Sequence, residues 1–151
     1  MSQPFTLQPL LDLMQNRADE ASRKLGQLIA AEQSAKSRLQ MLEQYRAEYA
    51  DRLRDAIAQG MTRQVLANYQ DFLARIDEAI HQQTLAVQQS ESNTSNGQLH
   101  WKEQNTRLKA IDTLSVRHDL KERQREEKKE QKLLDEFSAR KYASDANQRN
   151  D

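Results

Sequence analysis

Residues 11–57 read LDLMQNRADEASRKLGQLIAAEQSAKSRLQMLEQYRAEYADRLRDAI and place apolar side chains at two positions of nearly every seven. Counted in sevens from Leu11 and from Met14, these are the a and d positions of consecutive heptads, with Glu32 and Arg46 off the pattern. A strict seven-residue repeat keeps one stripe on a partner helix and predicts a left-handed coiled-coil seam. A helix of about fifty residues would be about 75 Å long.

The partner helix follows in the same chain. The first repeat stops at Ala58–Arg63 (AQGMTR), where Gly60 suits the left-handed cap of a helix and Thr62 can cap the next one. A second seven-residue repeat then begins, on Leu66, Leu73, Ile80 and Val87. Because a loop this short joins antiparallel neighbours, we expect the two repeats to pair with each other.

The second repeat weakens at Ser90–Gly97 (SESNTSNG), whose residues are poor helix formers. The helix either kinks here or continues because its neighbour holds it. A helical pattern resumes from Leu99, and Lys121–Lys132 (KERQREEKKEQK) then contains no apolar residue. We interpret this charged run as a solvated single helix stabilised by ion pairs between successive turns.

The sequence therefore predicts an all-α fold, in which two long helices form an antiparallel coiled-coil hairpin and the C-terminal helix is the longer. One hairpin domain is expected, with the bounds 1–143 for the domain, about 5–58 and 65–141 for the helices, 59–64 for the turn, and 144–151 for a disordered tail. Residues beyond about 118 have no partner in the first helix, so they should project as a charged rod with an apolar tip.

Composition excludes several function classes. Charged residues make up 30% of the chain and aromatic residues 5%, with only three glycines and two prolines, which is typical of long helices. The 23 basic and 23 acidic residues balance, which argues against a nucleic-acid or anionic-membrane partner. The chain has no cysteine, no signal-peptide pattern and no apolar run that would span a membrane, so we expect a cytoplasmic protein.

No arrangement of residues suggests an active site. His81, His100 and His118 lack the spacing of metal ligands, and we interpret them as solvated or seam-edge side chains. The three isolated glycines cannot form a phosphate-binding loop. We therefore expect no catalytic residue, cofactor or metal ion.

One row beside the seam carries more apolar character than a two-helix coil needs. In an antiparallel pair the g positions of both helices lie on one side, and here they include Tyr45, Val65, Phe72, Ala79 and Ala86. The row either widens the core or binds a partner. For Tyr45 and Phe72 both interpretations stay open, since exposed aromatic side chains often anchor binding surfaces.

The sequence resembles the flagellar FliJ family, the soluble stalk component of the flagellar type III export ATPase. The resemblance covers nearly the whole chain and is carried by Leu42–Tyr49 (LEQYRAEY), Gly60, Tyr69–Phe72 (YQDF), Glu78–Ile80 (EAI), Trp101 and Gln131–Phe137 (QKLLDEF). The sequence departs from the family pattern at Ser92–Gly97, which is richer in helix-breaking residues.

The resemblance implies a non-enzymatic protein that folds like the central stalk of a rotary ATPase. Its ends would enter the pore of the hexameric export ATPase and promote ring assembly, and it would also bind the membrane export gate and export chaperones. The implied gate-binding positions are Leu42, Tyr45, Tyr49, Phe72, Ile76 and Ala79. The implied ring-inserting positions are Gln131, Leu133, Leu134, Asp135 and Phe137.

Two alternatives remain at this point. The chain could be the equivalent stalk of a virulence type III secretion system, or a purely structural coiled coil that dimerises along its g row. A stalk should be a monomer when isolated, whereas the structural coiled coil should be an obligate dimer.

Overall fold

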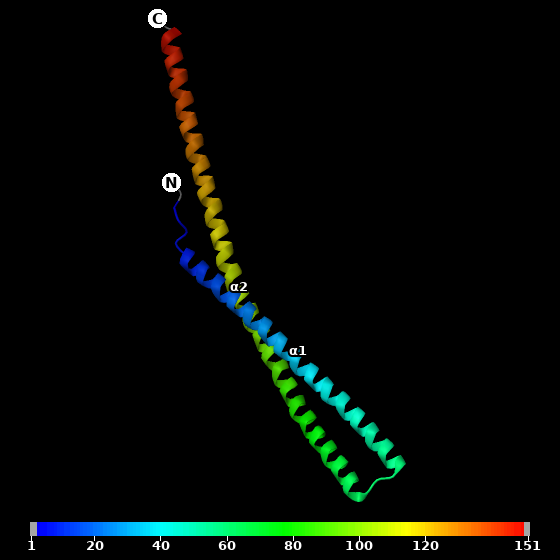
Figure 1. The fold of residues 1–151 in the computed structure, drawn as a ribbon. Helices are drawn as coiled ribbons and strands as arrows, with labels where there is room; N and C mark the ends of the chain where they lie inside the picture. The colour runs from blue at the N-terminus through cyan, green and yellow to red at the C-terminus, as the bar shows by residue number, and fades with distance from the viewer. Residues whose placement is uncertain (1–2, 150–151) are drawn as a thin grey trace. The chain divides into compact units, whose positions relative to one another are not determined.

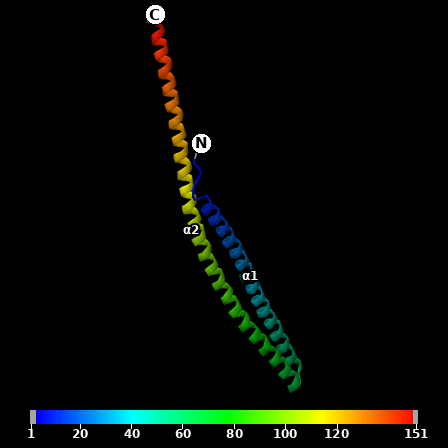
Figure 2. The same ribbon diagram turned by 90° about the vertical axis from the view of Figure 1, so that its left-hand side faces the viewer.

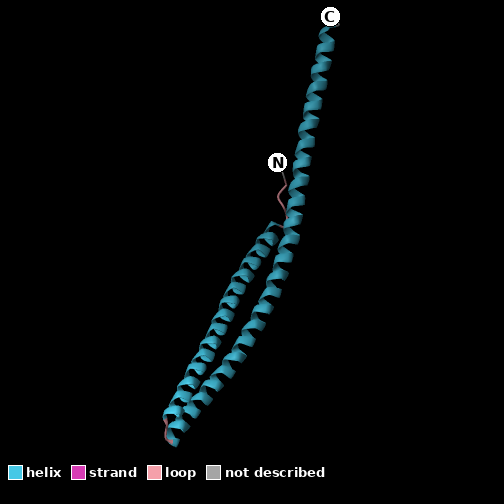
Figure 3. Cartoon of the chain, turned by 90° about the vertical axis from the view of Figure 1, so that its right-hand side faces the viewer, coloured by secondary structure: helices cyan, strands magenta, loops and turns pink. Residues whose placement is uncertain are grey.

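The chain folds into two long α-helices joined by a tight turn (Figures 1 and 3). A computed structural model describes residues 3–149, and within that range it contains no β-strand. Helix α1 runs over Gln8–Gln59 and helix α2 over Arg63–Arg149. The predicted all-α fold, with a longer second helix, is confirmed.

Helix α1 begins later than the expected residue 5. The amide of Gln8 donates to the carbonyl of Phe5 at 3.1 Å, and the regular helical pattern starts with Leu11 donating to Leu7 at 2.9 Å. Pro9 has no amide hydrogen to donate, and it is tolerated in the first turn because the first amides of a helix have no partner there. The prolines therefore delay the helix by one turn.

The turn uses the residues that the sequence indicated. Gly60 has a φ of 89°, a left-handed conformation that costs a residue with a side chain about 1 kcal/mol or more. Thr62 precedes the first residue of α2, and its Oγ1 accepts a hydrogen bond from the amide of Val65 at 3.3 Å. This is the N-cap geometry that satisfies one of the free amides of a new helix.

The seam of α1 follows the predicted heptads. Every a and d residue from Leu11 to Ala56 is buried or half-buried except Arg46. Its most buried members are Met14, Ala18 and Ala21, each at most 7% exposed. Small residues and flexible methionine let two helices approach closely along such a seam.

The seam of α2 continues straight through the region where the sequence suggested a break. An unbroken series of buried and half-buried residues keeps the same three-and-four spacing along α2, at Leu66, Tyr69, Leu73, Ile76, Ile80, Gln83, Val87, Ser90, Thr94, Gly97, Trp101, Gln104, Leu108, Ile111, Ser115, His118 and Glu122. The α-helix is unbroken at 92–97 because Thr94 and Gly97 fill seam positions there. Packing against a neighbouring helix outweighs their weak intrinsic helix preference.

The helices form two compact units along their length. One unit is Asp19–Glu103, and the other combines residues 3–18 with the described part of Gln104–Asp151. In a two-helix coil each residue contacts only its near neighbours across the seam, so distant levels share no common core.

The unit Asp19–Glu103 is an antiparallel hairpin that contains the turn (Figure 2). Two polar seam residues of α2 in this unit donate hydrogen bonds to the backbone of α1. Gln83 donates from Nε2 to the carbonyl of Ala35 at 2.9 Å, and Thr94 donates from Oγ1 to the carbonyl of Leu28 at 3.3 Å. At Gly97 a Cβ would lie only 2.7 Å from the Cδ1 of Leu28. The small residues of Ser90–Gly97 therefore make close helix contact possible.

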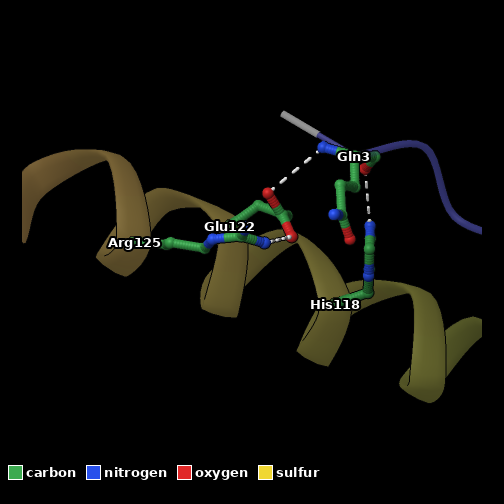
Figure 4. A network of polar contacts seen from close by, with 4 residues as sticks. All are labelled: Gln3, His118, Glu122 and Arg125. Carbon is green, nitrogen blue, oxygen red and sulfur yellow. Dashed lines mark hydrogen bonds and ion pairs between the residues drawn. The ribbon is translucent and has the colours of Figure 1, made fainter. Parts of the chain in front are cut away.

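The other unit packs the start of the chain against the second half of α2. Residues 3–7 are not helical, and Figure 4 shows Gln3 lying over the α2 side chains His118 and Glu122. The amide of Gln3 donates to Glu122 Oε2 at 3.2 Å, and His118 Nε2 lies 2.9 Å from the Gln3 carbonyl oxygen. The ring of Phe5 lies 5.5 Å from the His118 ring, centroid to centroid. This segment thus covers the last seam positions of α2.

Beyond Glu122, helix α2 has no partner among the described residues of its unit. Every residue from 123 to 149 is exposed, as the sequence predicted for residues past the end of the first helix. The expected disordered tail is wrong for residues 144–149, which are helical, while residues 150 and 151 lie outside the described part. Ser144–Arg149 contains no glycine or proline, and Arg149 in the last turn complements the helix dipole.

Candidate functional site

Four aromatic side chains gather on one flank of the hairpin unit, and we call them the aromatic cluster: Tyr45, Tyr49, Tyr69 and Phe72. Tyr49 is central, with ring centroids 4.5 Å from Phe72, 5.2 Å from Tyr69 and 6.4 Å from Tyr45. Tyr45 meets Phe72 edge-on, with centroids 6.3 Å apart and an interplanar angle of 72°. Such tilted and edge-to-face pairs add about 0.5–1.5 kcal/mol beyond burial.

The structure separates the roles that these side chains can play. Tyr45 is 45% exposed, whereas Tyr49 and Phe72 are half-buried between the helices. Of the other implied gate-binding residues, Leu42 and Ala79 are half-buried and Ile76 is only 5% exposed. Ile76 therefore supports the seam and has little surface to offer a partner.

Met41 is a surface residue that the sequence reading missed. It is 68% exposed and lies one helical turn before Tyr45 on α1. Residues four apart on a helix are neighbours on its surface, so Met41 and Tyr45 share one exposed apolar patch. The four-residue spacing of Met41 and Tyr45 indicates this patch in the sequence. The heptad pattern did not identify it, because Met41 is outside the a, d and g positions.

Beside the aromatic cluster, a polar pair joins α1 to α2. Arg46, the exposed a-position residue, donates from Nε to Asp77 Oδ1 and from Nη2 to Asp77 Oδ2, the latter at 3.4 Å. This fork geometry lowers the pKa of Asp77 through the hydrogen bond from Arg46 and raises the pKa of Arg46 through the same bond. The off-pattern Arg46 is thus explained by a cross-helix ion pair.

We expect Asp77→Asn to destabilise the protein slightly at neutral pH, and we expect this difference to vanish in acid. Because the folded state lowers the pKa of Asp77, the ion pair adds stability above the unfolded pKa. That contribution is lost as the pH falls below about 4, through the folded pKa of Asp77, while Arg46 stays protonated. Urea unfolding of both proteins across a pH series measures the difference. Asp71→Asn, which changes an exposed aspartate outside the ion pair, is the control. If the wild type and Asp77→Asn still differ in unfolding free energy at the lowest pH, the ion pair is not the cause of the difference.

The implied ring-inserting residues lie on the unpartnered part of α2, and we call residues 123–149 the end segment. Leu133, Leu134 and Phe137 are 65%, 61% and 67% exposed. Phe137 follows the adjacent pair Leu133 and Leu134 by one helical turn, so the three side chains form one apolar patch on α2. Gln131 donates from Nε2 to Asp135 Oδ1 at 3.0 Å, beside that patch. Tyr142 is 79% exposed further along the helix, and the sequence reading did not single it out.

Residues 3–149 contain no group of three or more histidine, cysteine or acidic side chains arranged to hold a metal ion. Within the same range, no helix combines the length and the apolar content that crossing a membrane requires. His118 contacts Gln3 and Phe5 at the seam edge, in agreement with a structural role.

Comparison with known proteins identifies the family. The family model described as "Flagellar FliJ protein" matches residues 2–147. The chain is 32% identical to the flagellar FliJ protein of Salmonella typhi and 31% identical to that of Escherichia coli K12, in each case over 93% of this chain and 95% of the relative.

A solved structure shares the fold. The YscO homologue CT670 of Chlamydia trachomatis superposes with a TM-score of 0.61 at 14% identity, covering 94% of this chain and 98% of that protein. The helices, the turn and the match over nearly the full length together establish that this chain belongs to the flagellar FliJ family.

Proposed function

We propose that this chain is a non-enzymatic coupling component of the flagellar type III protein export apparatus. In this role it promotes assembly of the hexameric export ATPase ring and links that ring to the membrane export gate and to export chaperones. Family membership supports the place in flagellar export. The observation that carries the mechanism is the end segment, an exposed helix with an apolar patch of Leu133, Leu134 and Phe137 midway along it.

Ring assembly follows from the burial of this apolar patch. A single helix with side chains is about 10–12 Å wide, so it can enter a channel along the axis of a ring. Each apolar side chain that becomes buried there contributes about 1.5–3 kcal/mol. Because that gain exists only when subunits surround the patch, it stabilises the assembled ring relative to its free subunits. An off-centre contact also biases identical subunits toward different states.

The aromatic cluster is the proposed contact for the cytoplasmic part of the export gate. It lies in the hairpin unit, whereas the end segment belongs to the other unit, so both partners can be bound without competing for the same residues. Exposed Tyr45 and Met41 supply the contact area, and the rings beneath Tyr45 hold its orientation. A chain with these roles works as a monomer in the cytoplasm, at the base of the flagellum.

The test adds the full chain to its cognate export ATPase and measures ATP hydrolysis and ring formation. We expect the wild-type chain to increase both. The variant L133A/L134A/F137A should bind the ring at least ~100-fold more weakly, since three apolar contacts are lost. Alanine favours helix, and these side chains are exposed among the described residues, so the fold should be unchanged.

A matched control removes three other exposed apolar side chains of α2. Leu114, Val116 and Leu120 are 44%, 51% and 50% exposed but precede the end segment. The variant L114A/V116A/L120A should retain ring assembly and ATPase stimulation. The proposal fails if the wild-type chain leaves hydrolysis and ring formation unchanged, or if the two triple variants behave alike.

A further inference from the structure

Residues 121–132 of α2 sort their charges around the helix. Each residue of an α-helix is rotated by about 100° from the one before it. Seen along the helix axis, five basic residues then lie within one arc of about 100°. We call this arc the basic sector, and it consists of Lys121, Arg125, Lys128, Lys129 and Lys132. The adjoining arc of about 140° holds the acidic sector, which consists of Glu122, Glu126, Glu127 and Glu130, together with Arg123. The two glutamines, Gln124 and Gln131, lie between the far edges of the sectors.

This pattern corrects the interpretation of the run as a helix stabilised by pairs between turns. Side chains four residues apart are neighbours, and here they mostly share a sign, as in Lys121–Arg125, Glu122–Glu126 and Lys128–Lys132. Each like-charged pair destabilises an isolated helix by about 0.2–0.5 kcal/mol. Opposite charges meet mainly three residues apart, as in Glu122–Arg125 and Glu126–Lys129, so this arrangement stabilises a solvated helix less than alternating charges would.

The protein itself does little to neutralise the sectors. Within residues 3–149, the ion pair recorded for this run joins Arg125 Nη1 to Glu122 Oε1 at 3.3 Å. Glu122 also accepts a hydrogen bond from the Gln3 amide at 3.2 Å (Figure 4). All other side chains of the run are exposed. Their charges are therefore available to a partner on both faces of the helix.

We propose that the basic sector docks on an acidic wall inside a protein channel, and that the two sectors together fix the rotational setting of the end segment. This inference rests on the proposed function and assigns to the ring channel an acidic surface at the level of residues 121–132. In a ring of identical subunits, the subunits facing the basic sector are attracted and those facing the acidic sector are repelled. Electrostatics of this kind contribute specificity and register more than raw affinity.

A protein channel fits the sectors better than a polyanion does. The run carries six basic and four acidic side chains, namely Lys121, Arg123, Arg125, Lys128, Lys129 and Lys132 against Glu122, Glu126, Glu127 and Glu130. Its excess positive charge is small, and the acidic sector lies within one helix width, which is close to the Debye length of about 8–10 Å in physiological salt. Anionic lipid or nucleic acid binding relies on clustered positive charge without such a neighbour.

The test exchanges two adjacent residues, in the full-length variant R125E/E126R. Composition and net charge are unchanged, but the like-charged neighbours become opposite pairs, including 121 with 125 and 126 with 130. Helix content should therefore be equal or higher. We expect affinity for the cognate export ATPase ring to fall about 10-fold at an ionic strength of about 0.1 M, and its salt dependence to weaken.

The exchange D51R/R52D is the matched control, because both residues are exposed on α1 of the hairpin unit. It should bind the ring like the wild type. Equal binding by R125E/E126R and the wild type overturns the docking of the sectors while leaving ring insertion by the apolar patch in place. Failure of the wild type to bind the ring overturns the proposed function as well. Binding of the wild type to phosphatidylserine vesicles or duplex DNA, with the same loss in R125E/E126R, overturns the protein channel as partner.

Discussion

Replacing Gly97 with leucine should lower the free energy of unfolding by about 1–3 kcal/mol, the usual cost of overpacking a filled core. A Cβ at this position would lie 2.7 Å from the Cδ1 of Leu28 and 3.5 Å from the Cδ1 of Leu25. The methyl group of Leu28 can move aside for one added carbon, but the rest of a leucine side chain requires the helices to separate. Urea unfolding followed by circular dichroism measures the loss.

The same substitution at Gly26 is the matched control. Gly26 is also inside a long helix, but a Cβ added there would meet nothing within 4 Å. Gly26→Leu should therefore stabilise the protein by about 0.5–1 kcal/mol, through helix preference alone. Opposite signs at the two glycines would show that Gly97 is selected for close helix contact. If both leucines stabilise the protein, the close approach of α1 at Gly97 is not a feature of the folded state.

The same region shows why part of the fold could not be predicted from the sequence. The seam of α1 was predicted residue by residue, because its a and d positions are mostly leucine, alanine and other apolar residues. In α2 the seam continues on Ser90, Thr94 and Gly97, which an apolar pattern cannot detect. Their place is decided by the opposing helix, since the Leu28 carbonyl accepts from Thr94 and the Leu28 side chain lies over Gly97.

Contacts between distant residues limited the prediction of the candidate site in the same way. The g row identified Tyr45 and Phe72, but it could not show that Tyr49 lies between them and Tyr69. Arg46 was an exception to the heptads until its partner Asp77 was known. The exposed tip of α2 was predictable, because the first helix is too short to cover it and helix length follows directly from residue number.

Tyr45→Ala should weaken binding to the cytoplasmic part of the export gate by about 10- to 100-fold, the effect expected for an aromatic anchor at the centre of an interface. Tyr45 is the exposed member of the aromatic cluster, at 45%, so its removal takes little from the folded state. The melting temperature and helix content should stay close to those of the wild type. Isothermal titration with the purified cytoplasmic part of the gate protein measures the affinity.

Phe72→Ala and Tyr49→Ala should behave differently. Their rings lie 4.5 Å apart and are half-buried, so truncating either one removes packing between α1 and α2. These variants should lower both the melting temperature and the affinity, since Tyr45 loses the rings that hold its orientation. Affinity changes in Phe72 and Tyr49 variants must therefore be read together with stability.

Two further variants decide whether Tyr45 itself binds the gate. Tyr45→Phe keeps the ring and should retain most of the affinity if apolar contact dominates. Ile57→Ala removes another exposed apolar residue of α1, 53% exposed and outside the cluster, and should bind like the wild type. Unchanged affinity in Tyr45→Ala would contradict the gate contact. A large loss of helix content in Tyr45→Ala would instead place Tyr45 in the core, because an exposed anchor can be removed without unfolding the helices that carry it.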